Sequence, residues 1–162
     1  MDGIFDSIFI PNKFFKKKQS TYLSSILAFI AIFFVNLIAF PETVGRIFGF
    51  LGLKAVIIFI IAFPILYFIN FGIDLLFITS DKNNWTKTHY GHTFSPYLFL
   101  PFPILFIMNS NLHIKIAGFA LLIVLIAWSS ILFSKLSVGF KTLLLRILKD
   151  ILIIYFWINL VI

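Results

Sequence analysis

The sequence predicts an all-α membrane protein, a bundle of five transmembrane helices with a short interfacial helix at the N-terminus. Of the 162 residues, 61% are hydrophobic and only 12% are charged, whereas soluble domains average about 45–50% and about 25%. The mean hydropathy is +1.09, and long apolar segments recur between short polar connections. So few polar residues cannot coat a globule in water, so lipid is expected to surround most of the surface.

The chain divides into an arm, residues 1–21, and a transmembrane domain, residues 22–162. A helix needs roughly 20 apolar residues to cross hydrocarbon. The first segment fits, and no small-residue cleavage site follows it, so it is expected to be a span rather than a signal peptide. Pro64 is expected to kink the second segment, because proline removes a helix hydrogen bond. The expected spans cover residues 22–40, 53–79, 94–108, 112–133 and 142–162.

The third segment, residues 94–108, is the doubtful one. At about 1.5 Å per residue it covers only about 22 Å, against a bilayer core of about 30 Å. It either crosses as a short kinked helix or dips in and returns. Pro101 and Pro103 each free a carbonyl that must find another partner, so this segment is expected to be central and surrounded by protein. The prolines are either a structural kink or a moving hinge.

Basic residues decide between the two topologies, because Lys and Arg collect on cytoplasmic flanks. With five crossings and a cytoplasmic N-terminus, ten basic residues lie inside, and only Arg46, Lys54 and Lys115 lie outside. A re-entrant third segment would leave seven inside and six outside. The count favours five crossings, with the C-terminus on the side opposite the cytoplasm.

The arm combines an apolar face with a basic cluster. Ile4, Phe5, Ile8 and Phe9 recur at helical spacing, and three lysines follow, Lys16, Lys17 and Lys18. This combination is typical of segments that lie on an anionic leaflet. The arm is therefore expected to be an orienting anchor at the lipid surface, or a site for a particular lipid or partner.

The chain resembles the Yip1-domain family of small polytopic membrane proteins. That family combines an arm of the form P-x-x-F-F, a glycine-containing stretch before a proline-bearing span, and a tryptophan before a basic turn with glycine. The resemblance covers nearly the whole chain. The residues that match are Pro11, Phe14, Phe15, Gly91, Pro101, Trp128, Gly139 and Lys141.

The resemblance implies a non-enzymatic protein of membrane trafficking or membrane organisation. Eukaryotic members carry a long cytoplasmic N-terminal tail and bind small GTPases through cytoplasmic regions; this chain lacks such a tail. A compact relative in a prokaryotic cytoplasmic membrane is therefore expected. Its expected partners are the bilayer, with anionic lipid at the cytoplasmic face, and a membrane protein or a second copy.

No catalytic motif is present: neither H-E-x-x-H, G-x-S-x-G nor a phosphate-binding glycine loop occurs. The chain has no cysteine, and no basic stretch with interleaved aromatics indicates nucleic acid. His89 and His92 have a spacing that can share a metal, but a tetrahedral zinc site needs more ligands than this stretch offers. They are expected to be polar loop residues at the level of the headgroups, with no metal and no cofactor.

Ionisable residues within apolar segments are costly and usually face a bundle interior. Asp74 in the second segment and Arg146, Lys149 and Asp150 in the fifth share one depth near the cytoplasmic end. Asp74 is expected to face Arg146, and Asp150 to complete the group from the next turn. The cluster is either a structural ion-pair network or a site for an ion, a proton or a lipid headgroup.

Two classes of function remain. The first is a membrane scaffold or adaptor that organises lipids or partner proteins. The second is a small transporter or channel component that uses the charge cluster. A polar stripe through all depths would favour transport, whereas the polar residues gather at one end, which favours the scaffold.

Overall fold

The chain is helical throughout the part that the computed structural model describes, residues 2–15, 21–42, 45, 49, 53–77, 88–136 and 139–161, and no strand occurs among these residues. The predicted all-helical class is confirmed for them. The elements are α1 (Asp2–Phe9), α2 (Pro11–Phe14), α3 (Tyr22–Ile38), α5 (Leu53–Phe77), the 3₁₀ helix η1 (Tyr90–Phe99), α7 (Pro101–Met108), α8 (Leu112–Ser134) and α9 (Phe140–Val161).

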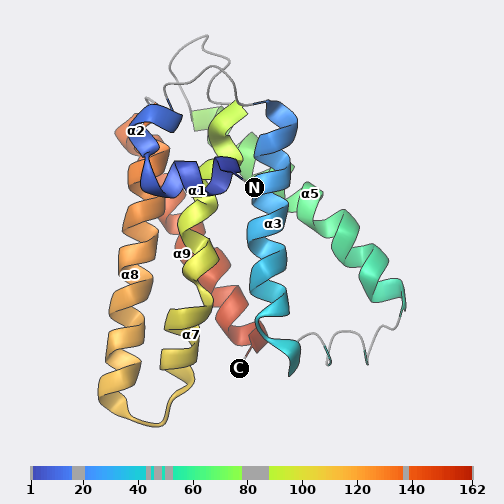
Figure 1. Ribbon diagram of the computed structural model, residues 1–162, viewed down its shortest axis with the longest axis vertical. Coiled ribbons are helices and arrows are strands. Elements are labelled where there is room, and N and C mark those ends of the chain that lie inside the picture. The colour runs from blue at the N-terminus through green and yellow to red at the C-terminus, as the bar shows by residue number, and fades with distance from the viewer. Residues whose placement is uncertain are drawn as a thin grey trace.

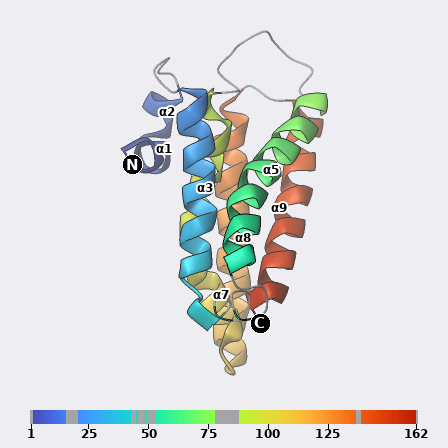
Figure 2. The same cartoon turned by 90° about the vertical axis from the view of Figure 1, so that its right-hand side faces the viewer.

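Successive long elements run in alternating directions along a common axis (Figures 1 and 2). Helix α3 leads away from the end where the arm lies, α5 returns, η1 and α7 lead away together, α8 returns and α9 leads away again. The arm, α1 and α2, crosses the side of the bundle near the end where α3 begins (Figure 1).

Within the described residues, two helical segments are long and apolar enough to cross a membrane, judged by length and composition alone. They are Tyr90–Met108, with 19 residues, and Leu112–Ser134, with 23 residues. Tyr22–Ile38 and Pro64–Leu76 are shorter apolar helices. Helix α9 has the length but carries Lys141, Arg146, Lys149 and Asp150, which make it less apolar.

The third segment is longer than the sequence predicted, because it begins at Tyr90 and its first 10 residues form a 3₁₀ helix. A 3₁₀ helix rises about 2.0 Å per residue, against about 1.5 Å in an α-helix. The continuous segment from Tyr90 to Met108 therefore covers roughly 30 Å rather than 22 Å. The expectation of a segment too short for a bilayer was wrong, because it assumed α-helical rise and a start at Phe94.

The prolines end or shape helices in different ways. Pro64 lies inside α5, and the helix continues through it. Pro101 occupies the first turn of α7, where a missing N–H leaves no bond unmade. Pro101 nevertheless removes the donor that an α-helix would offer to the carbonyl of Tyr97. The side-chain amide of Asn36 on α3 donates to that carbonyl at 2.7 Å.

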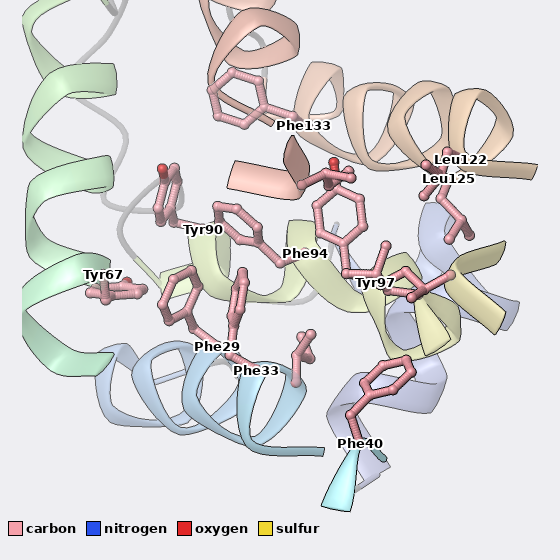
Figure 3. Packing of buried hydrophobic residues seen from close by; sticks show 14 of the residues in the cluster. Phe29, Phe33, Phe40, Tyr67, Tyr90, Phe94, Tyr97, Leu122, Leu125 and Phe133 are labelled. Atoms are coloured by element: carbon pink, nitrogen blue, oxygen red, sulfur yellow. The ribbon is translucent and has the colours of Figure 1, made fainter. Parts of the chain in front are cut away.

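The segment η1 is the centre of the bundle, as the prolines predicted, since Tyr90 to Tyr97 are all buried. Aromatic rings surround it: Phe94 lies 4.9 Å from Phe29 and 5.5 Å from Tyr90, centroid to centroid, in edge-to-face geometry (Figure 3). Such pairs contribute about 0.5–1.5 kcal/mol beyond area burial. At Gly91 the backbone packs directly on α3, because a Cβ there would lie 1.9 Å from the carbonyl oxygen of Ser25.

The outer surface is apolar, and the interior holds polar and charged side chains. Leu76, Phe156, Ile123, Leu112 and Leu23 are each more than half exposed. The buried polar or charged residues of the bundle include Ser25, Asn36, Asn70, Asp74, His89, His92, Thr93, Ser129, Ser130, Thr142, Arg146 and Asp150. The interior also contains a hydrophobic core, so the features unusual for a soluble domain are the many large apolar side chains outside and the charged side chains inside.

Candidate functional site

The four charged residues that the sequence grouped by depth lie together in the structure. Asp74 stands near the end of α5, and Arg146, Lys149 and Asp150 stand on α9. Asp74, Arg146 and Asp150 are at most 1% exposed, and the side chain of Lys149 is 12% exposed. We call these four side chains the charge network.

Arg146 is the hub of the charge network. Its Nε donates to both carboxylate oxygens of Asp150, at 2.9 and 3.1 Å, one helical turn along α9. Its Nη1 lies 3.8 Å from Oδ2 of Asp74, which is an ion pair without a direct hydrogen bond. Its Nη2 donates to Thr93 Oγ1 and Ser129 Oγ, each at 3.2 Å. Helices α5, η1, α8 and α9 therefore meet at one guanidinium.

The flat face of the guanidinium rests on an aromatic wall. Its Cζ lies 3.5 Å from the centroid of the Phe94 ring, 5.0 Å from that of Phe133 and 5.5 Å from that of Tyr90. The three rings stand around the same space in Figure 3. A cation over an aromatic face gains about 2 kcal/mol or more when it is desolvated. Arginine suits this position because its planar group stacks and donates at once.

The two carboxylates are held by further partners. Lys149 Nζ lies 2.5 Å from Oδ1 of Asp74 and donates to the carbonyl of Asn70 at 3.1 Å. The hydroxyl of Tyr90 donates to Oδ2 of Asp74. On the other side, the Tyr97 hydroxyl donates to Oδ2 of Asp150, and Ser129 Oγ lies 3.2 Å from the same oxygen.

The formal charges of the network cancel, because two acidic side chains face two basic ones. Removing one member of a buried pair typically costs about 3–5 kcal/mol, because the remaining charge is left uncompensated. The network thus links α5 to α9 and ties both to η1 and α8. Its chemistry is that of an ion-pair cluster in which one donor group stays without a hydrogen bond, because Arg146 Nη1 reaches Asp74 only at ion-pair distance.

The two predicted histidines, His89 and His92, lie outside the charge network, and their burial differs from the expectation. His89 and His92 are 1% and 3% exposed, and they stand at and just after the start of η1, so they are buried rather than exposed loop residues. They lie at the start of η1, beneath the arm, where the Phe14 ring lies 5.1 Å from His89 and 4.9 Å from His92. The sequence could not show this cover, because it depends on the path of the arm. Among the described residues, no group of three or more His, Asp or Glu side chains could hold a metal.

The remaining predicted positions are distributed along the fold. Lys16, Lys17 and Lys18 lie outside the described residues. Pro103 is buried in the first turn of α7. Of the residues that carry the family resemblance, Phe14 and Phe15 pack against the histidines, Gly91 packs on Ser25, and Trp128 stacks with Phe99.

Sequence reasoning missed the uncharged partners of the charge network, Tyr90, Thr93, Tyr97 and Ser129. The available signal was their polarity within apolar segments. A hydroxyl in such a segment needs a partner, and a buried charge needs several donors or acceptors. The spacing of Tyr90, Thr93 and Tyr97, at i, i+3 and i+7, is that of one α-helical face. Tyr90 and Thr93 were missed because the third segment was expected to begin only at Phe94, whereas the helix begins at Tyr90.

No protein-family model matches this chain, and the comparisons with curated proteins and with solved structures found no significant match.

Proposed function

We propose that this chain is a multi-pass membrane protein whose five long elements, α3, α5, η1 with α7, α8 and α9, all cross the bilayer. The support is an exterior rich in large apolar side chains together with charged side chains that are buried beside the hydrophobic core. Lipid is the solvent in which such a distribution is stable. The alternating directions of the five elements (Figure 1) and the length of roughly 30 Å for Tyr90–Met108 are further support.

The proposed orientation has the N-terminus in the cytoplasm and the C-terminus on the opposite side. The ten-to-three distribution of basic residues supports it. The end of the bundle near the arm, where α8 ends and α9 begins (Figure 1), is the cytoplasmic end in this orientation. The basic arm segment, Lys16 to Lys18, belongs to that end and is proposed to attract anionic lipid.

The proposed role is that of a non-enzymatic scaffold or adaptor of the Yip1 type, which organises lipids or partner proteins in a prokaryotic cytoplasmic membrane. One observation carries this choice over a transporter or channel component: the charge network is formally neutral, and each carboxylate pairs with a cation of the same network. A transport site must bind its ion weakly enough to release it. A network in which each carboxylate faces a cation and a tyrosine hydroxyl suits a fixed structural role better.

The test is reconstitution of the purified chain into vesicles of phosphatidylcholine and phosphatidylglycerol. For a scaffold, proton and potassium leakage should equal that of empty vesicles, and phosphatidylglycerol should be enriched in the lipid layer next to the protein. Asp74→Asn serves as the matched variant. Flux that depends on Asp74 would overturn the scaffold proposal in favour of transport.

A further inference from the structure

Helix α1 is built from a repeated tetrad, Asp-Gly-Ile-Phe followed by Asp-Ser-Ile-Phe. Because an α-helix has 3.6 residues per turn, residues four apart lie above one another and each tetrad position forms a stripe along the helix. The stripes are Asp2 with Asp6, Gly3 with Ser7, Ile4 with Ile8, and Phe5 with Phe9. The helix therefore has four chemically different sides.

Two adjacent stripes face the protein. Ser7 and Ile8 are 0% and 4% exposed, and the Ser7 hydroxyl is hydrogen-bonded to that of Ser95 on η1 at 2.7 Å. A Cβ at Gly3 would lie 3.2 Å from Nε2 of His92, so this stripe lies tightly on η1. The contact fixes how α1 is rotated about its own axis.

The phenylalanine stripe and Asp6 face outward. Phe5 is 54% exposed and Phe9 is 72% exposed, and Asp6 is exposed beside them. The phenylalanine stripe lies next to the isoleucine stripe, and the aspartate stripe lies next to the glycine and serine stripe. Around the circumference of α1, the sides that face the protein are therefore followed by the apolar side of Phe5 and Phe9, and then by the acidic side of Asp6.

The position of α1 on the bundle indicates which of its outward sides meets lipid and which meets water. Helix α1 runs across the bundle axis rather than along it (Figures 1 and 2). It contacts η1 at Ser95, five residues after Tyr90, which is roughly 10 Å into the third segment at about 2.0 Å per residue. Amphipathic helices in a membrane interface lie with the apolar face about 5–10 Å into the headgroup and acyl boundary. The neighbouring outer surface of α3 is also apolar, with Leu23 64% and Leu27 55% exposed.

From this geometry we propose that Phe5 and Phe9 form an interaction surface for the acyl chains of one leaflet, while Asp6 faces water. The arm is then an in-plane helix clamped to η1 at a fixed depth, and its lipid contact is the phenylalanine stripe rather than the whole apolar face that the sequence indicated. This inference rests on the proposed membrane location of the bundle. Helix α1 also contacts α3, whose exposed side chains near its start, Leu23 and Leu27, are apolar as well; this shared apolar exterior is the reason for assigning acyl chains, rather than a partner helix, to the stripe.

The test uses the absence of cysteine from the chain. Single cysteines replace Phe5, Phe9, Asp6 and Asn12, and a nitroxide label is attached to each in vesicles of phosphatidylcholine and phosphatidylglycerol. The collision rate of the label with oxygen, relative to that with a water-soluble nickel complex, reports its depth. At Phe5 and Phe9 this ratio should exceed the ratio at Asp6 and Asn12 by about fivefold or more, because these two labels sit roughly 5–10 Å below the headgroup boundary.

A label at Ile123→Cys on the outer face of α8, 68% exposed, separates failure of this inference from failure of the proposed function. The Ile123 label can be lipid-exposed while the Phe5 and Phe9 labels contact the nickel complex. That result would overturn the proposed contact of Phe5 and Phe9 with acyl chains and would leave the proposed membrane location of the bundle intact. Immobile labels at Phe5 and Phe9 that meet neither reagent, or labels that broaden each other's spectra between copies, would show a protein occupant and overturn the inference. If the Ile123 label itself lies in water, the membrane proposal fails.

Discussion

Arg146 illustrates how one side chain can determine the packing of four elements. Its guanidinium makes hydrogen bonds in three directions and lies over Phe94. Arg146→Leu leaves Asp150 and Asp74 without their shared cation and is expected to reduce the free energy of unfolding by about 3–5 kcal/mol. Arg146→Lys keeps the charge and loses the fork of donors and the stacking, so it should also destabilise, by a smaller amount. Thermal unfolding in detergent measures both.

The two carboxylates should couple unequally to Arg146. The contacts to Asp150 are at 2.9 and 3.1 Å, whereas the closest contact to Asp74 is at 3.8 Å. Asp74→Asn should itself destabilise the fold, because Lys149 loses its carboxylate partner, and combined with Arg146→Leu it should recover part of the loss. A double-mutant cycle should give a coupling energy of about 0.5–3 kcal/mol, larger for Asp150→Asn than for Asp74→Asn. Zero coupling in both cycles would show that the charge network does not hold the bundle.

Glycine at position 91 is required by a close approach of two helices. In Gly91→Ala the new methyl group would meet the backbone of Ser25 at 1.9 Å, so η1 would have to move away from α3. A cost of more than about 3 kcal/mol is expected. Gly72→Ala on α5 is the matched control, because nothing lies within 4 Å of a Cβ there, and it should be neutral or stabilise by up to about 1 kcal/mol. Equal melting temperatures of the two variants would contradict the packing of η1 on α3.

At the scale of the element, the third segment is stable because its neighbours supply donors that its prolines lack. Asn36 donates to the carbonyl of Tyr97, which Pro101 leaves without an i+4 donor and which also accepts from the N–H of Leu100 at 3.2 Å. Ser129 on α8 can likewise donate to the carbonyl of Thr93, at 3.1 Å; in a 3₁₀ helix this carbonyl would bond to the absent N–H of Pro96. A proline-rich helix is thus completed by side chains from α3 and α8.

The compensation between Asn36 and Pro101 can be measured. Asn36→Leu should cost about 0.5–1.5 kcal/mol in the wild-type background, because the carbonyl of Tyr97 loses its shorter hydrogen bond and keeps the one from the N–H of Leu100. In a Pro101→Ala background the new N–H can serve Tyr97, so the same change should cost less. Asn70→Leu is the control, since its amide donates within α5 to Leu66 and should show the same cost in both backgrounds. If Asn36→Leu costs equally in both backgrounds, Pro101 is not the reason for Asn36.

At the scale of the whole molecule, the prediction concerns sidedness. Single cysteines at Asn12 and Lys135 should be protected from a membrane-impermeant maleimide in intact cells, and those at Glu42 and Asn111 should be labelled. The four positions are exposed and flank the arm, α3 and α8. Labelling of Asn111 and Lys135 from the same side would exclude a crossing by α8 and contradict the five-span proposal.

A structural feature of this chain is predictable from the sequence when the interactions that determine it are between residues close in the sequence. Helix bounds were predictable, as for α8, expected at 112–133 and found at Leu112–Ser134, because apolar run length and capping are local. The approach of Asp74 to Arg146 and Asp150 was also predictable, since a buried charge needs an opposite one nearby. The start and 3₁₀ form of the third segment were not, because it is supported by contacts with Ser25, Asn36 and Ser129, which are far away in the sequence.

The sequence by itself therefore determined that the chain is helical, that its charges gather at one end, and that a proline-rich segment needs protein around it. These follow from composition, periodicity and the cost of unpaired polar groups. Only the tertiary structure decided that tyrosine hydroxyls complete the charge network, that the arm covers His89 and His92, and that α1 presents Phe5 and Phe9 outward. Each of these depends on the rotation of one helix against another. That rotation is set by close contacts such as Gly91 with Ser25 and Ser7 with Ser95, which leave no periodic trace in the sequence.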